Sequence, residues 1–176
     1  YTRAGCCPRP FERMQFLRGT ENIFMDLAFQ PDEFFHLRDQ IHAYNLRELE
    51  MWCKTKVAAV FLMDDWGSPQ SLLIAPDQWR EQFKPFYKEY TDMIKQAGKY
   101  VFMHSDGHTR AIYPDLIEIG VDALNSQLFC MDIEEISAAF RGKITFYGEV
   151  DRQQILPFGT PEDVKAAVRR LRGALD

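Results

Sequence analysis

Short apolar runs alternate along this chain with longer segments whose apolar residues recur at helical spacing. The runs are residues 57–63, 100–103, 121–124 and 144–147. Each run is short and almost unbroken by polar residues, which is typical of a strand buried on both faces. Strict alternation with helices through short connections predicts an α/β fold, with a parallel sheet and right-handed crossovers.

Helix signals surround these runs. The predicted helices span residues 31–54, 75–96, 108–119 and 132–140, and a last one starts at 160. Asp32 and Glu33 place negative charge in a first helical turn, and Thr160 precedes Pro161 as an N-cap residue. Pro85 predicts a kink in the second helix or the start of another helix.

Two architectures fit about four parallel strands with intervening helices: an open doubly wound sheet and a segment of a (β/α)8 TIM barrel. No G-x-G-x-x-G motif follows any of the runs. Charged or amide residues follow them instead, as in barrels. Because a closed barrel needs about eight strands, the barrel interpretation requires that the other half was lost or comes from another chain. The chain starts at Tyr1 without Met, and we expect residues 1–176 to be a single, incomplete barrel domain from a longer protein.

Composition narrows the class of protein. Apolar residues make up 46% and charged residues 27%, which excludes a disordered chain. The longest fully apolar run, residues 57–63, is too short to span a bilayer, so we expect no membrane segment. A net charge of −5 without a basic cluster argues against a nucleic-acid partner. The four cysteines, Cys6, Cys7, Cys53 and Cys130, show no C-x-x-C spacing, so we expect free thiols and a cytoplasmic protein.

Polar side chains gather where the predicted strands end. In chain order the strand ends read Asp64-Asp65-Trp66-Gly67, His104-Ser105-Asp106-Gly107, Asn125-Ser126-Gln127 and Glu149-Val150-Asp151. In a barrel these ends meet at one mouth, where barrel proteins place their chemistry.

His104 and Asp106 form the most specific of these patterns. Residues two apart on an extended strand project to the same side, so both side chains can reach one point. Such a pair can bind a divalent metal such as zinc. It can also form a histidine–carboxylate pair for acid–base work, or merely hold the turn at Gly107.

The other strand ends supply further candidates. Asp64 and Asp65 are candidate catalytic groups together with His104, and one of the two is expected to face the mouth while its neighbour caps a loop. Trp66 either stacks on a flat ligand or covers the core. Asn125, Gln127 and Glu149 complete the candidate substrate-binding set.

Several ordered motifs resemble the uroporphyrinogen decarboxylase superfamily. They include Phe61-Leu-Met-Asp-Asp-Trp-Gly67, His104-Ser-Asp-Gly107 and Tyr147-Gly-Glu-Val-Asp151. The resemblance implies a (β/α)8 barrel about twice as long as this chain, which would lack the first strands and the last one.

The same resemblance implies two chemistries. One branch comprises corrinoid-dependent methyltransferases, in which zinc activates a thiol that accepts a methyl group. Its His-x-Cys pair corresponds to His104 and Asp106 here, so the resemblance implies zinc at these residues and a corrinoid protein as partner. The other branch decarboxylates uroporphyrinogen, a tetrapyrrole, without a metal or organic cofactor, and there Asp64 or Asp65 would hold pyrrole N–H groups.

We expect methyl transfer, with decarboxylation as the alternative. A third possibility is an inactive or truncated binding scaffold. The exposed sheet edges of such a half barrel would favour pairing into a homo-oligomer.

Overall fold

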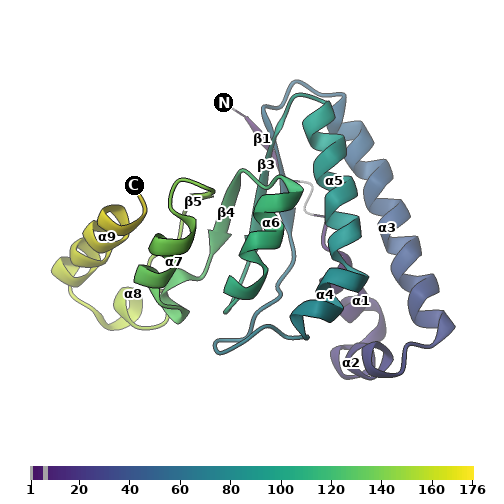
Figure 1. Ribbon diagram of the computed structural model, residues 1–176, viewed down its shortest axis with the longest axis horizontal. Coiled ribbons are helices and arrows are strands. Elements are labelled where there is room, and N and C mark those ends of the chain that lie inside the picture. Colours follow the sequence, from purple (N-terminus) through teal and green to yellow (C-terminus); the bar gives the residue numbers. More distant parts are fainter. Residues whose placement is uncertain (1, 6–7) are drawn as a thin grey trace.

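A computed structural model describes residues 2–5 and 8–176 of the chain (Figure 1). The predicted free thiols of Cys6 and Cys7 lie outside the described residues. Cys53 and Cys130 are free and half-buried.

The described residues form one sheet of five parallel strands. The strands are β1 (Arg3–Ala4), β2 (Ala59–Met63), β3 (Tyr100–Ser105), β4 (Ala123–Ser126) and β5 (Thr145–Phe146). They lie side by side in the order in which they occur along the chain. The four predicted strands are confirmed, and β1 is an addition because two residues are too few to show as an apolar run.

Helices fill the connections. They are α1 (Pro10–Arg18), α2 (Thr20–Phe29), α3 (Asp32–Cys53), α4 (Pro76–Gln82), α5 (Lys84–Gln96), α6 (Tyr113–Ile119), α7 (Ile133–Phe140), α8 (Ile155–Phe158) and α9 (Pro161–Leu175), with short 3-10 helices at Arg110–Ile112 and Leu128–Cys130. The break predicted near Pro85 is confirmed, since α4 ends at Gln82 and Pro85 lies in the first turn of α5. The predicted helix over 108–119 is too long. Its first residues form a loop and a 3-10 turn, and α6 begins one residue before Pro114.

The strand order decides between the two architectures. When every right-handed crossover moves to the next strand in the same direction, all crossover helices fall on the same face of the sheet. Figure 1 shows α7, α6, α5 and α3 following one another in a row from left to right. The chain is therefore a segment of a TIM-barrel-type fold and not a doubly wound sheet.

Successive strand residues alternate between two environments. Val60 and Leu62 of β2 are fully buried against the helices. Phe61, Met63 and Phe102 alternate with buried neighbours and are only half-buried, because they face the open side of the sheet. This open side corresponds to the inner wall of a barrel.

Arg3 lies across the open side. Its guanidinium is 4.5 Å from the ring centroid of Phe61 and 5.5 Å from that of Phe102. Its Nη1 donates a hydrogen bond of 3.2 Å to the Tyr147 hydroxyl, just beyond β5. The first strand of the sheet is thus joined to the segment that follows the last.

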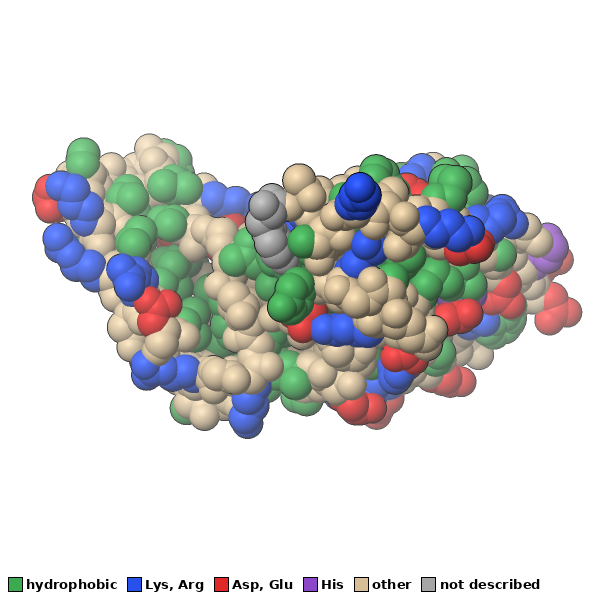
Figure 2. Space-filling view, turned by 90° about the horizontal axis from the view of Figure 1, so that it is seen from above, with side chains coloured by type: hydrophobic (Ala, Val, Ile, Leu, Met, Phe, Trp, Pro, Cys, Tyr) green, Lys and Arg blue, Asp and Glu red, His purple; other side chains and the backbone are tan. Residues whose placement is uncertain are grey.

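The space-filling view shows an apolar hollow in the C-terminal part of the molecule (Figure 2). Hydrophobic side chains gather in a hollow at the end of the molecule that carries α9. Phe146, Val168, Leu171 and Leu175 are among the residues that line this hollow. Among the described helices, none is long and apolar enough to cross a membrane.

A candidate metal centre at the carboxyl ends of the strands

Strand register brings three sequence-predicted site residues together. Met63 of β2 lies beside His104 of β3, which in turn lies beside Asn125 of β4. Asp65 follows Met63 by two residues and Asp106 follows His104 by two, so both carboxylates project toward the same side as the imidazole.

Asp65, His104 and Asp106 form a compact triad. One carboxylate oxygen of each aspartate and one ring nitrogen of His104 lie within 4.8 Å of one another. His104 Nε2 is 3.4 Å from Asp65 Oδ1 and also 3.4 Å from Asp106 Oδ1. All three side chains are half-buried, so a small ligand can reach them.

Asn125 fixes the orientation of the His104 ring. Its amide nitrogen donates to the backbone oxygen of Tyr147 at 2.7 Å, so its Oδ1 faces His104 Nδ1 at 2.5 Å and accepts the hydrogen from that nitrogen. In a neutral ring, Nε2 then presents a lone pair to two carboxylate oxygens. Three electron-rich atoms facing one another need a proton or a cation between them.

The electrostatics of the triad agree with this geometry. Burial alone would lower the pKa of His104, but its contacts with Asp65, Asn125 and Asp106 outweigh burial and raise it. Burial alone would raise the pKa of Asp65, but the contact with His104 and the backbone amide of Asp106 outweigh it, so this pKa lies below its ordinary value. The site therefore favours negative carboxylates around a positive charge.

Two glutamates flank the triad. Burial raises the pKa of Glu12 and of Glu149, and the negative charge of Asp106 raises both further. Among the described residues, Glu12 Oε2, Glu149 Oε1 and Asp106 Oδ1 are buried without a hydrogen-bond partner. Arg152 forms an ion pair with the other oxygen of Asp106 and lies 3.8 Å from Glu149. Glu12 Oε2 also lies 3.8 Å from Arg9 Nη1. Buried acceptors that have charged neighbours but no hydrogen bond mark a place where a ligand is expected.

Asp64 does not face the mouth. Its side chain is fully buried on the helix side of the sheet, where it accepts hydrogen bonds from the backbone amides of Phe11 and Glu12, both at 2.8 Å, and from the Tyr87 hydroxyl at 2.6 Å. It thereby satisfies two free amides in the first turn of α1. Asp65 is thus the aspartate that faces the mouth, while Asp64 caps the start of helix α1 and not the expected loop.

Trp66 and Gln127 were candidate substrate-binding residues, but the structure buries both side chains. Trp66 is fully buried, its ring stacks on Phe11 at 4.4 Å, and its Nε1 donates to the Tyr87 hydroxyl. Gln127 is buried and accepts a hydrogen bond from the backbone amide of Gly107 at 3.1 Å. These two side chains hold the strand-end loops, because the alternation of strand residues turns Trp66 toward the helices.

Glycines let the loops after β2 and β3 touch. Gly107 has φ +80°, and a Cβ there would lie 2.2 Å from the backbone of Gly67. The backbone amide of Gly67 donates to the carbonyl of Asp106 at 3.0 Å, so this contact sets the position of one triad member.

Replacing Gly107 by alanine is expected to destabilise the protein far more than the same change at Gly142. Both glycines have positive φ, but a Cβ at Gly142 meets nothing within 4 Å. Alanine at a positive φ costs about 1 kcal/mol in each variant. Only Gly107→Ala must also push the backbone of Gly67 away. Urea denaturation of the two variants measures the difference, and equal losses would contradict the close-contact explanation.

Sequence patterns did not reveal Glu12. It lies in α1, outside every predicted element, and reaches the site because Asp64 holds the start of that helix. Two adjacent aspartates after a buried strand are a signal for such an arrangement, since one of them must find donors on the helix side.

The fold and the strand-end groups together define a barrel-type α/β protein with a candidate metal centre at the carboxyl ends of its strands. The chain belongs to the uroporphyrinogen decarboxylase family, because the family model described as uroporphyrinogen decarboxylase (URO-D) matches residues 4–174. A search of curated proteins gives no significant match.

A solved structure has the same fold. It is a methyltransferase from Methanosarcina mazei, with a TM-score of 0.75 and 15% sequence identity. The match covers 94% of this chain and 48% of the methyltransferase. The chain thus spans about half the length of that protein, and at this identity the match shows the fold alone.

Proposed function

We propose that this chain carries the metal-binding part of a zinc-dependent methyltransferase, which moves a methyl group from a corrinoid on a partner protein to a thiol. The observation that carries the proposal is the triad of Asp65, His104 and Asp106 within 4.8 Å at the strand ends. The family assignment and the methyltransferase fold neighbour support it at the level of the family.

The residues present fit a divalent metal. Imidazole nitrogen and carboxylate oxygen are both zinc ligands, and three protein ligands leave a position for a substrate, as in catalytic zinc sites. Asp106 Oδ1 is buried without a hydrogen-bond partner among the described residues, and the Nε2 lone pair of His104 faces it. Bound zinc would lower the pKa of a thiol and favour the thiolate.

The chain's own residues have distinct tasks in this proposal. Asp65, His104 and Asp106 hold the metal, and Asn125 orients the imidazole through Nδ1. Arg152 neutralises the second oxygen of Asp106. Because its side chain is about half exposed, Arg152 is also able to contact an anionic group on an incoming substrate.

Decarboxylation of uroporphyrinogen is the second candidate. The observation that favours it is the set of buried oxygens without a hydrogen bond on Glu12, Glu149 and Asp106, which suit the N–H groups of a pyrrole. Asp64 does not belong to this set, because its oxygens already accept three hydrogen bonds.

Calorimetric titration of the metal-free protein with Zn²⁺, followed by a transfer assay, tests the proposal. We expect one zinc per chain. In the assay, methylcobalamin and small thiols replace the partner-bound substrates, and loss of the methyl–cobalt absorbance reports transfer. Absence of zinc binding would exclude the zinc mechanism, and carbon dioxide release from uroporphyrinogen without any metal would favour the second candidate.

A further inference from the structure

The turn that follows β5 contacts Asn125, the residue that orients the His104 ring. Leu124 of β4 lies beside Phe146 of β5 in the strand register, and the backbone amide of Tyr147 donates to the Leu124 oxygen at 3.1 Å. Asn125 therefore lies next to Tyr147. Its side-chain Nδ2 donates to the backbone oxygen of Tyr147 at 2.7 Å.

The Asn125 amide can face a neutral His104 ring in two ways. It has an oxygen at one end and an NH2 group at the other, and a half-turn exchanges the two without changing the shape of the group. With the oxygen toward Nδ1, that nitrogen keeps the hydrogen and Nε2 presents a lone pair. With the NH2 group there, Nδ1 must accept, and the hydrogen moves to Nε2, which faces Asp65 and Asp106. Only the first arrangement leaves Nε2 able to bind a metal.

The backbone oxygen of Tyr147 decides between these two arrangements. A carbonyl oxygen accepts hydrogen bonds and cannot donate them, so it pairs with the NH2 end of Asn125. The oxygen end of the amide is thereby turned toward His104 Nδ1. A main-chain atom outside the triad thus selects the ring nitrogen that carries the hydrogen.

Gly148 leaves the space that this pairing needs. Its φ is +95°, and a Cβ there would lie 2.2 Å from Asn125 Nδ2 and 3.4 Å from Asn125 Cγ. The obstructing atom is the end of a side chain, which moves at little cost, whereas a Cβ at Gly107 would meet backbone. A side chain in place of Gly148 is therefore expected to displace the Asn125 amide while the fold stays intact.

The rest of Tyr147 is held on the open side of the sheet. Its hydroxyl accepts the hydrogen bond from Arg3 at 3.2 Å, and its ring lies edge to face against Phe102 with 5.2 Å between the ring centroids. Its backbone amide is bonded to Leu124. Both ends of the residue are therefore fixed, so the backbone oxygen offers Asn125 an acceptor at a defined position.

We propose that Tyr147 and Gly148 are positioning residues of the metal centre. The Tyr147 backbone oxygen orients the Asn125 amide, and Gly148 keeps the space for that amide, so that His104 offers Nε2 to a metal. Neither residue belongs to the triad. The inference rests on the proposed function for its consequence in zinc binding, but the position of the hydrogen on His104 is a property of the metal-free chain.

Nitrogen-15 NMR of the histidine rings tests the position of the hydrogen in the metal-free protein, at a pH at which His104 is neutral. Ring nitrogens with and without hydrogen differ widely in chemical shift, and His104→Ala assigns the signals. We expect the hydrogen on Nδ1 in wild type and a loss of this preference in Gly148→Ala. Titration with Zn²⁺ is expected to show a dissociation constant raised by about tenfold in that variant.

Two further glycine variants separate contact with Asn125 from backbone strain. Gly148→Asn also carries a Cβ, but asparagine adopts positive φ more readily than alanine. We expect it to behave as Gly148→Ala does. Gly98→Ala is the matched control, since Gly98 has φ +70° and a Cβ there meets nothing within 4 Å. It is expected to keep the wild-type hydrogen position and zinc affinity, and circular dichroism shows that each variant is folded.

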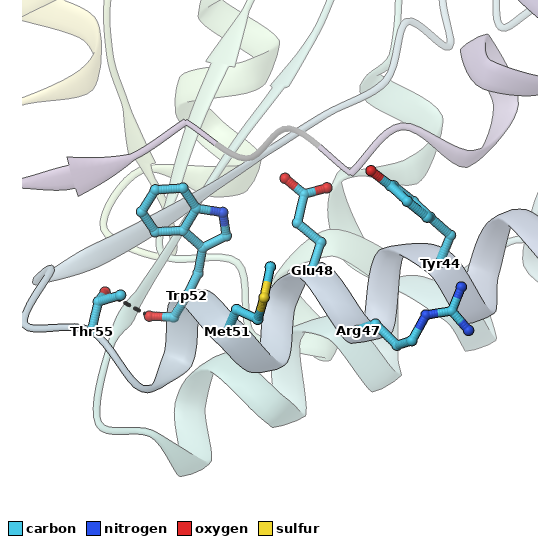
Figure 3. Close-up of a pocket in the computed structure, with 6 residues that line it drawn as sticks. All are labelled: Tyr44, Arg47, Glu48, Met51, Trp52 and Thr55. Atoms are coloured by element: carbon cyan, nitrogen blue, oxygen red, sulfur yellow. Dashed lines mark hydrogen bonds between the residues drawn. The ribbon is translucent and has the colours of Figure 1, made fainter.

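Tyr147→Phe tests whether the backbone oxygen is the positioning atom. The variant loses the hydroxyl and keeps the backbone oxygen, so we expect the wild-type hydrogen position and zinc affinity. Tyr44→Phe makes the same change in the groove on α3 that Figure 3 shows, where Tyr44 is 58% exposed, and it measures the effect of removing a hydroxyl alone.

Several results would overturn the proposal. They are a hydrogen on Nε2 in wild type, wild-type behaviour of Gly148→Ala or Gly148→Asn, and an equal effect of Gly98→Ala. A loss in Tyr147→Phe as large as that in Gly148→Ala, with Tyr44→Phe unchanged, would assign the positioning to the ring and also overturn it. A wild-type chain that carries the hydrogen on Nδ1 but binds no zinc would contradict the proposed function and support this inference.

Discussion

Replacing Asp64 by asparagine is expected to lower the free energy of unfolding by about 2–4 kcal/mol, because buried donors then lose acceptors. The carboxylate accepts from the backbone amides of Phe11 and Glu12 and from the Tyr87 hydroxyl. An asparagine side chain has one acceptor oxygen, and its amino group would face a donor. Urea denaturation above pH 7, where Asp64 is ionised, measures the loss.

Asp65 provides the matched control for this variant. It is the next residue and has the same side chain, but it faces the open side and is half-buried. Asp65→Asn is expected to change stability by less than about 1 kcal/mol. If the two variants were equally stable, Asp64 would not hold α1 as the hydrogen bonds indicate.

The pH dependence of stability provides a second test of the role of Asp64. Burial raises the pKa of Asp64 to about 7, against the opposing effect of its hydrogen bonds. Between pH 4 and pH 7 the folded protein then keeps a proton that the unfolded chain has released. This group therefore contributes stability below pH 4 that is lost as pH rises toward 7, and the loss is expected to be absent from Asp64→Asn.

Replacing His104 by alanine is expected to weaken zinc binding by at least about 100-fold, because it removes one of three ligands. Asp65→Asn is expected to have a similar effect. Asn125→Ala leaves all three ligands but frees the imidazole ring, so a smaller loss of about 10–100-fold is expected. Calorimetric titration with Zn²⁺ ranks the three variants.

The ranking distinguishes a metal site from a mere histidine–carboxylate pair. Cobalt offers a second readout, since bound Co²⁺ absorbs visible light in a way that depends on its ligands. Equal zinc affinity in wild type and His104→Ala would contradict the triad as the metal site. His36→Ala serves as a control, because it removes an exposed imidazole from α3 that is not part of the triad.

The sequence predicted the parallel sheet, most of the helices and the edge at which the polar groups gather. It could not decide between Asp64 and Asp65, because residues 57–63 are almost uniformly apolar and so show no alternation between the two faces of the strand. The strand register, in which Met63 lies beside His104, resolves the choice only once the sheet is known.

The beginning of the chain was the least predictable part. Strand β1 has two residues, and α1 has no marked apolar face, so neither gives a periodic signal. Glu12 therefore escaped notice, although it flanks the triad. Its position depends on a tertiary contact with Asp64, 52 residues away, which no local pattern contains.

The link between Arg3 and Tyr147 has a consequence for the curvature of the sheet. In a flat sheet, strands at positions one and five would lie about 19 Å apart. A hydrogen bond of 3.2 Å between side chains from the first strand and from the end of the last strand requires the sheet to curve. The Arg3 side chain then spans the concave side of the sheet. The Arg3 guanidinium packs over the rings of Phe61 and Phe102, so these contacts support the curvature from the concave side. This chain thus contains its own means of holding β2, β3 and β4 at the angles that make Asp65, His104 and Asn125 converge.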